Sequence, residues 1–219
     1  MGISTGYDSL DQLLGGGLHN GLLYMLESGR GVEETSLAIN MVNNICIREH
    51  HSAAFFSLHM CTDQILSRII ALEAQVDFQK LVFVRLDESE WERVDKATDN
   101  IARSRIMIDD TERISTEEIR VKCKEYKERY SCEAVFIDSL ERVTCEAENF
   151  ELARHRFAKI IRNLRLLAEE LNVPIVVLSH ASPKVIRREK YKQVMDSEQW
   201  EEITKIADVI MIKTPSLPS

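Results

Sequence analysis

The chain has 219 residues, of which 44% are hydrophobic and 29% are charged, so it can bury the core of one full α/β domain but not of two. Lysine and arginine total 28 against 36 for aspartate and glutamate, and the net charge of -8 opposes a general attraction to nucleic-acid backbones. No apolar run reaches the roughly 20 residues that span a bilayer, and the start MGISTGYDSL lacks the features of a secretory signal. We therefore expect a cytoplasmic protein with no membrane contact.

Short apolar, β-branched or aromatic runs alternate with longer segments of helical period, which is typical of a mainly parallel sheet covered by helices. Strands are predicted at residues 22–27, 52–58, 81–86, 105–109, 133–138, 174–179 and 208–213. Helices are predicted at residues 35–49, 62–75, 88–103, 115–130, 150–172 and 197–206. The expected fold class is therefore α/β, as a single domain of residues 1–213 with a flexible C-terminal tail of residues 214–219.

The fourth predicted helix has a defined start. Ser115 is followed three residues later by Glu118, and the two side chains can reciprocally satisfy free N–H groups as a capping box. We therefore expect the helix to begin directly after Ser115.

The five cysteines are Cys46, Cys61, Cys123, Cys132 and Cys145, an odd number without a C-x-x-C pair. In a cytoplasmic protein this pattern predicts reduced thiols, most of them packed. It does not indicate a cysteine zinc site or a redox site.

The first predicted strand is followed by a glycine-containing turn and an amphipathic helix, the context in which G-x-x-x-x-G-K-[ST] binds phosphates through backbone N–H groups. The eight corresponding positions are Ser28, Gly29, Arg30, Gly31, Val32, Glu33, Glu34 and Thr35. Glutamates replace the second glycine and the lysine, so an attraction for phosphate becomes a repulsion, each about 4 kcal/mol at ~4 Å with an effective dielectric near 20. Micromolar ATP binding totals only about 8 kcal/mol. The loop predicts weak Mg-ATP binding or none; the alternative is an ordinary turn in an unrelated α/β protein.

Several longer segments carry a family resemblance. TGYDSLDQLLGGGL (5–18) resembles the entry segment of the RecA superfamily, particularly archaeal recombinases and circadian-clock ATPases. IDDTERISTEEIRVKCKEYKERYSCEAVFIDSLERV (108–143), with FFSLHM (55–60) and LNVPIVVLSHASPKV (171–185), resembles the C-terminal motor domain of bacterial hexameric replicative DNA helicases. The resemblance covers residues 4 to about 212 and implies a RecA-like P-loop NTPase fold with helices on both faces of the sheet.

The resemblance also implies roles for single residues. Asp138 matches the Walker B aspartate that orients magnesium, and Thr35 matches the hydroxyl that ligates it. His59 stands where the family has its catalytic glutamate, and His180 stands where it has the glutamine that senses the γ-phosphate. A neutral imidazole lacks the anionic carboxylate that polarises the attacking water. We therefore expect no catalytic residue and no resident cofactor, with a vestigial magnesium position at Thr35 and Asp138.

Each of these residues has a structural alternative. Asp138 could accept backbone hydrogen bonds at a strand end, and Thr35 could simply start a helix. His59 and His180 are expected to approach each other at the carboxyl edge of the parallel sheet, with a structural role rather than as a metal site built on two histidines.

The loop itself requires an internal partner if no phosphate organises it. The helix that follows the loop presents free N–H groups and the positive end of its dipole. A carboxylate from Glu33 or Glu34 could fill this anion site from within, with Arg30 balancing the added charge. The loop would then be closed to nucleotide by its own side chain.

Residues 184–192, KVIRREKYK, form a basic segment at a place where related motors carry a DNA-contacting loop. Its candidate nucleic-acid contacts are Lys184, Arg187, Arg188, Lys190 and Lys192, and Tyr191 adds a surface on which a base could stack. The alternative is a solvated flexible loop. Residues 141–151 are acidic and would repel a strand, so we expect weak binding of single-stranded DNA at most.

Three functions remain open at this point. The first is a non-hydrolysing RecA-fold paralogue of a replicative helicase or recombinase, acting as a protein-interaction or regulatory subunit that self-associates or binds a protein partner. The second is an ATP-binding, helicase-like motor with an unconventional loop that uses contacts such as Arg30. The third is a nucleotide-independent module that binds single-stranded DNA through residues 184–192.

Overall fold

A six-stranded parallel sheet forms the centre of the molecule in the computed structural model, which describes residues 2–28, 32–145, 155–180 and 197–213. The strand order is β3-β2-β5-β7-β1-β8, and every neighbouring pair is parallel. The strands are β1 (Leu23–Ser28), β2 (Ser52–Ser57), β3 (Arg105–Asp109), β5 (Ala134–Asp138), β7 (Ile175–Ser179) and β8 (Val209–Lys213). Six of the seven predicted strands and the α/β class are therefore confirmed.

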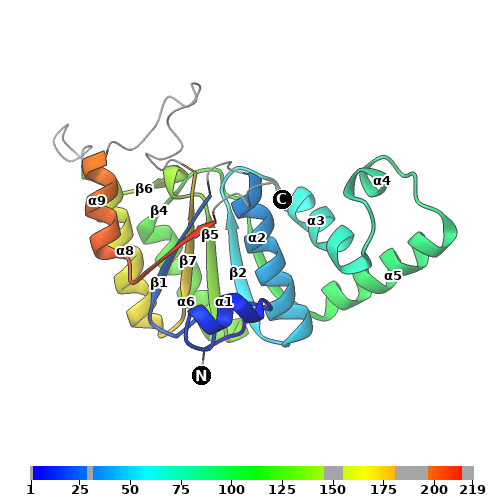
Figure 1. Cartoon of the computed structure of the whole chain (residues 1–219), viewed down its shortest axis with the longest axis horizontal. Helices are drawn as coiled ribbons and strands as arrows, with labels where there is room; N and C mark the ends of the chain where they lie inside the picture. Colours follow the sequence, from blue (N-terminus) through cyan, green and yellow to red (C-terminus); the bar gives the residue numbers. More distant parts are fainter. Residues whose placement is uncertain (1, 29–31, 146–154, 181–196, 214–219) are drawn as a thin grey trace.

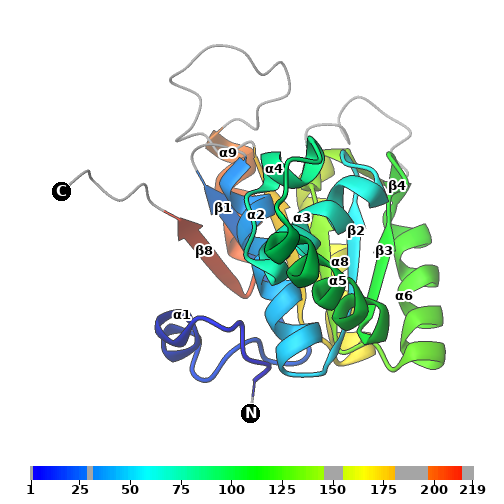
Figure 2. The ribbon, with the colours of Figure 1, turned by 90° about the vertical axis from the view of Figure 1, so that its right-hand side faces the viewer.

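Helices cover both faces of this sheet (Figure 1 and Figure 2). On one face lie α2 (Val32–Asn43), the π-helical turn η1 (Asn44–Arg48) and α3 (Thr62–Ala74). On the other lie α6 (Thr116–Tyr130), α8 (Arg156–Leu171) and α9 (Ser197–Ile206). The sequence therefore folds into the three-layer arrangement that its strand and helix alternation predicts.

The remaining elements lie around this core. A lobe formed by α3, α4 (Phe78–Val82) and α5 (Glu88–Arg103) projects at one end of the molecule in Figure 1. The short elements are α1 (Asp8–Leu13), the 3-10 turn η2 (Leu140–Arg142) and the two-stranded parallel pair β4 (Ile114–Ser115) and β6 (Val143–Thr144). Two-residue strands and single turns carry too little periodicity to be recognised in the sequence.

Alternating side chains of the strands supply the two halves of the core. Phe56 packs in the cluster under α6 and α8, whereas its neighbour Phe55 packs in the cluster under α2 and α3. All six residues of β2 are buried, as expected for a parallel strand covered on both faces. Full burial of each phenylalanine contributes about 1.5–3 kcal/mol to the free energy of folding. Burial of apolar side chains on both faces therefore favours the position of β2 between β3 and β5.

The predicted strand at residues 81–86 is wrong. The Asp77 side chain accepts a hydrogen bond of 2.9 Å from the Lys80 backbone N–H and caps the short helix α4 instead. Val82 ends this helix, and Phe83 and Val84 follow it. These three residues do not enter the core, because their exposed fractions are 51%, 63% and 70%. An apolar run of strand-like composition therefore lies on the surface of the lobe.

Other local predictions can be compared directly. Ser115 is the N-cap of α6: its Oγ accepts a 3.1 Å hydrogen bond from Glu118 N–H, and the Glu118 carboxylate accepts a 2.8 Å bond from Ser115 N–H, which confirms the capping box. The helix predicted to start at residue 35 begins at Val32. All five cysteines are free thiols, three of them buried and Cys61 exposed. Among the described helices, none has the length and hydropathy to cross a bilayer.

Candidate functional site

The predicted site residues meet at the carboxyl edge of the sheet, where parallel strands of this fold class present their ligand-binding groups. Asp138 ends β5, His180 follows β7, and His59 lies in the turn after β2. Glu34 and Thr35 lie in the first turn of α2, which follows β1. Segments far apart in the chain are thereby brought together, so the expected approach of the two histidines is confirmed.

Asp138 is the centre of the cluster. Its side chain is fully buried, and Oδ2 accepts a hydrogen bond of 2.7 Å from Thr35 Oγ1. Oδ1 accepts a hydrogen bond of 3.0 Å from His180 Nε2 and lies 3.7 Å from His59 Nδ1. Both oxygens of the Asp138 carboxylate therefore contact side chains of the protein itself. The peptide bond between Asp138 and Ser139 is cis.

Glu34 is the residue that the predicted phosphate-binding motif aligns with its lysine. Its side chain is fully buried, and Oε2 lies 3.4 Å from Nδ1 of His180. A carboxylate in the first turn is also favoured by the positive end of the helix dipole. The Glu34 carboxylate is therefore buried beside the imidazole of His180, and its predicted contact with the N–H groups of the loop stays a prediction. The suggested partner Arg30 lies outside the described residues.

His180 thus lies between two buried carboxylates. Burial of the imidazole by itself lowers its pKa, but the hydrogen bond to Asp138 and the nearby carboxylates of Glu34 and Glu141 outweigh burial and raise the pKa of His180 to about 10. The ring is therefore an imidazolium at neutral pH. A positive charge at the residue that follows β7 therefore lies beside the Glu34 carboxylate.

Backbone contacts hold the two histidines in position. Glu141 Oε1 accepts hydrogen bonds of 3.0 Å from the backbone N–H of His180 and from Ser179 Oγ, which fixes the end of β7. In the turn that carries His59, Ser57 Oγ donates a 2.7 Å hydrogen bond to the carbonyl of Met60. The two imidazole rings meet edge to face with centroids 5.9 Å apart.

The cluster opens to solvent on the histidine side. The side chains of His59 and His180 are 29% and 24% exposed, whereas Asp138 and Glu34 are fully buried. The buried carboxylates hold the cluster together, and the imidazoles form its outer surface.

These residues do not fit Mg-ATP. The hydroxyl of Thr35 and the carboxylate of Asp138 keep the proximity expected of a magnesium pair. However, a buried carboxylate stands where the phosphates require a cation, and Asp138 is engaged by His180.

Part of the predicted loop and the predicted DNA contacts cannot be placed in this geometry. Gly29, Arg30 and Gly31 lie outside the described residues, as do the side chains of Ser28, Val32 and Glu33. The same holds for the basic candidates Lys184, Arg187, Arg188, Lys190 and Lys192, and for residues 146–151 of the acidic loop. Their roles stay predictions.

Glu141 is a residue of the site that sequence reasoning missed. In the sequence it is one of several carboxylates in the acidic stretch 141–151. In the structure its carboxylate accepts hydrogen bonds from Ser179 Oγ and the backbone N–H of His180. Its place three residues after Asp138 is the one available signal, because a residue just beyond a strand end faces the same edge.

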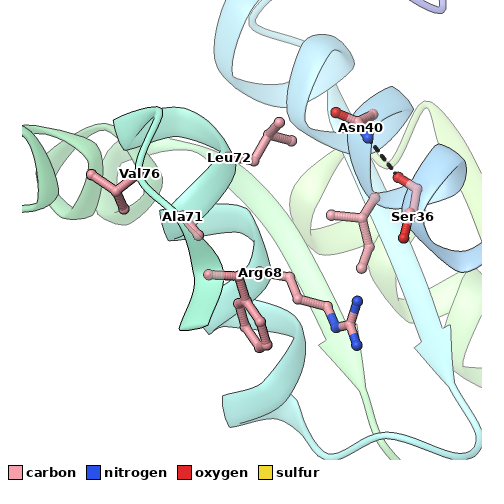
Figure 3. A pocket seen from close by; sticks show the side chains of 8 residues that line it. Ser36, Asn40, Arg68, Ala71, Leu72 and Val76 are labelled. Carbon is pink, nitrogen blue, oxygen red and sulfur yellow. Dashed lines mark hydrogen bonds between the residues drawn. The ribbon is translucent and has the colours of Figure 1, made fainter. Parts of the chain in front are cut away.

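A separate pocket of about 250 Å³ lies between α2, α3 and α4 (Figure 3). Arg68 lies over the ring of Phe78, 5.1 Å from its centroid, and Asn40 donates a 2.8 Å hydrogen bond to the carbonyl of Ser36. The lining residues are Ser36, Ile39, Asn40, Arg68, Ala71, Leu72, Val76 and Phe78. No predicted site residue lines this pocket, so it is distinct from the cluster around Asp138.

Comparisons with known proteins agree with this fold. The family described as DnaB-like helicase C terminal domain matches residues 2–214. The chain is 30% identical over 210 residues to the replicative DNA helicase DnaC of Bacillus subtilis, covering 95% of this chain and 46% of the relative. It is 31% identical over 222 residues to the replicative DNA helicase DnaB of Rickettsia typhi, covering 96% and 44%. The chain thus spans about half the length of the curated relatives it matches.

Two solved structures share the fold. One is described as an ATPase domain and superimposes with a TM-score of 0.83 at 23% identity, covering 97% of this chain and 75% of that one. The other, a DnaB-like replicative helicase described with its interactions with primase, superimposes with a TM-score of 0.84 at 23% identity, covering 97% and 51%. These likenesses establish the RecA-like helicase ATPase fold for the described part of the chain.

Proposed function

Because the chain belongs to the DnaB-like helicase C-terminal domain family, we propose that it is a non-hydrolysing member that has kept the motor fold and acts as a protein-interaction or regulatory subunit. One observation carries the proposal: the buried carboxylate of Glu34 and the imidazole of His180 meet at 3.4 Å inside the phosphate-binding edge. The anion site of the family is filled by a pair of the protein's own side chains.

The electrostatics of this pair support the same conclusion. A nucleotide phosphate entering the site has to approach Glu34, which carries a charge of the same sign as the phosphate. Breaking the pair would also leave a buried charge without its partner, which typically costs about 3–5 kcal/mol. Repulsion and pair disruption together are comparable to the roughly 8 kcal/mol of micromolar binding, so we expect Mg-ATP to bind weakly at best.

The site also lacks the carboxylate that would activate water for hydrolysis at the position of His59. His59 stands where the resemblance places the catalytic glutamate, and its Nδ1 faces Asp138 at 3.7 Å. General-base catalysis contributes typically about 10²–10⁴-fold to a rate. A bound nucleotide would therefore still turn over slowly.

Phosphate release by the full chain tests this function. We expect the rate with Mg-ATP, with or without single-stranded DNA, to equal that of the Asp138→Ala variant and of buffer. The Bacillus subtilis relative serves as the positive control for the assay. Turnover at motor-like rates that is lost in Asp138→Ala would refute the proposal.

An interaction role also needs a surface. Val82, Phe83 and Val84 are 51%, 63% and 70% exposed on the lobe that projects from the sheet in Figure 1. We propose that a second copy of the chain covers this segment, because self-association buries apolar residues that the fold itself leaves in water. Sedimentation should show association that weakens in Phe83→Asp but not in Val121→Asp, a control on the exposed face of α6.

The opposite outcomes of that experiment are equally clear. A wild-type protein that is strictly monomeric, or that dissociates equally in both variants, contradicts the proposed surface. A different protein that co-purifies and is lost only in Phe83→Asp would assign the surface to a heterologous partner.

A magnesium-ATP motor is the second candidate, and one contact favours it. Thr35 and Asp138, the pair that the resemblance assigns to magnesium, remain 2.7 Å apart. If this pair still functions, the phosphate-release assay should detect turnover in the wild type that Asp138→Ala removes.

A further inference from the structure

Three positions at which this chain departs from the pattern that the resemblance implies meet in one cluster, and two of them face one carboxylate. His59, His180 and Glu34 replace a glutamate, a glutamine and a lysine, respectively, and the two imidazoles both face Asp138. One ligand atom from each of His59, Asp138 and His180 lies within 4.8 Å of the others. Loss of a nucleotide site alone gives no reason for two imidazoles to meet at the same oxygen.

We propose that His59, Asp138 and His180 form a binding site for a transition-metal ion of the Zn²⁺ class, with Glu34 as the residue that orients His180. Two imidazoles and a carboxylate are a common ligand set for Zn²⁺. Mg²⁺, by contrast, prefers oxygen ligands and retains water. The site shares Asp138 with the magnesium position that the resemblance implies but differs from it in its two imidazole ligands and in its metal, and it does not depend on the proposed function.

The distances suit such an ion. Zn²⁺ bonds of about 2.0–2.2 Å in a tetrahedron place neighbouring ligand atoms about 3.4 Å apart. The Asp138 Oδ1 separations of 3.0 Å from His180 Nε2 and 3.7 Å from His59 Nδ1 bracket this value. The widest pair needs to contract by at most about 1.4 Å from its 4.8 Å limit. His59 lies in a turn with a partly exposed side chain, so its imidazole has room to make this adjustment.

The groups behind the ligands match those that support metal sites. Metal-bound histidines usually donate their other ring N–H to a carboxylate, which fixes the ring and its tautomer. Glu34 Oε2 lies 3.4 Å from Nδ1 of His180, on the side of the ring where such a carboxylate is needed. Binding of the ion to Nε2 displaces to solvent the proton that Nε2 shares with Asp138 in the metal-free cluster. Thr35 Oγ1 holds the other oxygen of Asp138 at 2.7 Å.

The outer side of the cluster provides access. Both imidazoles are about one-quarter exposed, so an ion can enter from solvent and keep a fourth position open. Three protein ligands with an open position are the arrangement of a reactive or partner-completed zinc site rather than a closed structural one. The fourth ligand is then water or a side chain of a partner.

Calorimetric titration of the chelator-treated full chain with ZnCl₂, without nucleotide, tests the site. We expect one ion per chain, with binding unaffected by excess Mg²⁺. His59→Ala and His180→Gln should each lose this one-to-one binding, and Glu34→Gln should weaken it about 10- to 100-fold. Visible absorption of bound Co²⁺ should report a tetrahedral environment in the wild type and lose it in His59→Ala.

Two control variants separate this site from other zinc ligands. Cys61→Ser removes the exposed thiol that lies two residues from His59. His155→Ala removes a surface histidine that pairs with a carboxylate, Glu202, at 2.9 Å. Neither should change the affinity.

Several results would overturn the assignment. These are the absence of stoichiometric Zn²⁺ binding in the wild type, unchanged affinity in both His59→Ala and His180→Gln, and loss of binding in Cys61→Ser. The outcome is independent of nucleotide chemistry. A chain that binds Zn²⁺ and also hydrolyses ATP retains this site and refutes the proposed function, and a chain that does neither refutes this site and retains the proposed function.

Discussion

The pairing of Glu34 with His180 has a measurable energy. At the observed 3.4 Å, two opposite unit charges attract by about 5 kcal/mol at an effective dielectric near 20. Desolvation of the fully buried Glu34 carboxylate offsets several kcal/mol of this attraction. Glu34→Gln removes both terms together, and His180 keeps Asp138 as a carboxylate partner at 3.0 Å. We therefore expect the free energy of unfolding to fall by only about 1–2 kcal/mol, less than the roughly 3–5 kcal/mol typical of a buried charge left without a partner.

A double-mutant cycle isolates the direct interaction. We expect Glu34→Gln, His180→Gln and the double variant to give a coupling free energy of about 1–3 kcal/mol, measured by urea unfolding at neutral pH. The pair His155 and Glu202 is the matched control, because the same residue types meet at 2.9 Å but are 62% and 36% exposed. Its cycle should give about 0–1 kcal/mol. A coupling of Glu34 with His180 that is no larger than the control would refute the internally paired site.

Three further predictions concern the rest of the chain. Ser115→Ala should lower the free energy of unfolding by about 0.5–2 kcal/mol because α6 loses its N-cap; an unchanged urea midpoint would contradict this. Exposed Cys61 should react first with a thiol reagent in the folded protein, whereas burial raises the pKa of Cys46 to about 12 and of Cys132 to about 11, so both should react only on unfolding. Fluorescence anisotropy should show weak binding of single-stranded DNA at physiological salt, because the net charge is -8; nanomolar affinity lost on neutralising the basic residues of 184–192 would contradict it.

The strands show what an apolar run can and cannot predict. Residues 52–57 and 81–86 are both rich in apolar side chains, yet only the first became a strand. The first run has the partner strands β3 and β5 on its two sides, whereas the second begins in α4 and pairs with no strand of the described sheet. Strand formation depends on such neighbours, which lie far away in the sequence. The side chain of Asp77 caps the N-terminus of α4 and stabilises this short helix instead.

The site was predictable to a similar extent. Strand ends of a parallel sheet share one edge, so the approach of His59 and His180 followed from the strand assignment, whereas their contact with Asp138 was not predicted. The cationic partner of Glu34 was not predicted either, because local spacing favoured Arg30 whereas the imidazole of His180 follows a strand far along the chain. The anchor Glu141 was hidden in the same way, since a single carboxylate in an acidic stretch has no distinguishing pattern.

We propose that the side chains of Glu34 and His180 fill the phosphate-binding edge of the sheet. Replacing Glu34 by lysine alone would place an ammonium against His180, so restoration of the site also requires His180→Gln. The most direct measurement is therefore a calorimetric titration with Mg-ATP of the wild type and of the variant Glu33→Gly, Glu34→Lys, His180→Gln. We predict no measurable binding to the wild type and binding to the variant through the retained Thr35 and Asp138. Equal affinity of the two proteins for Mg-ATP would show that Glu34 and His180 do not close this edge to nucleotide.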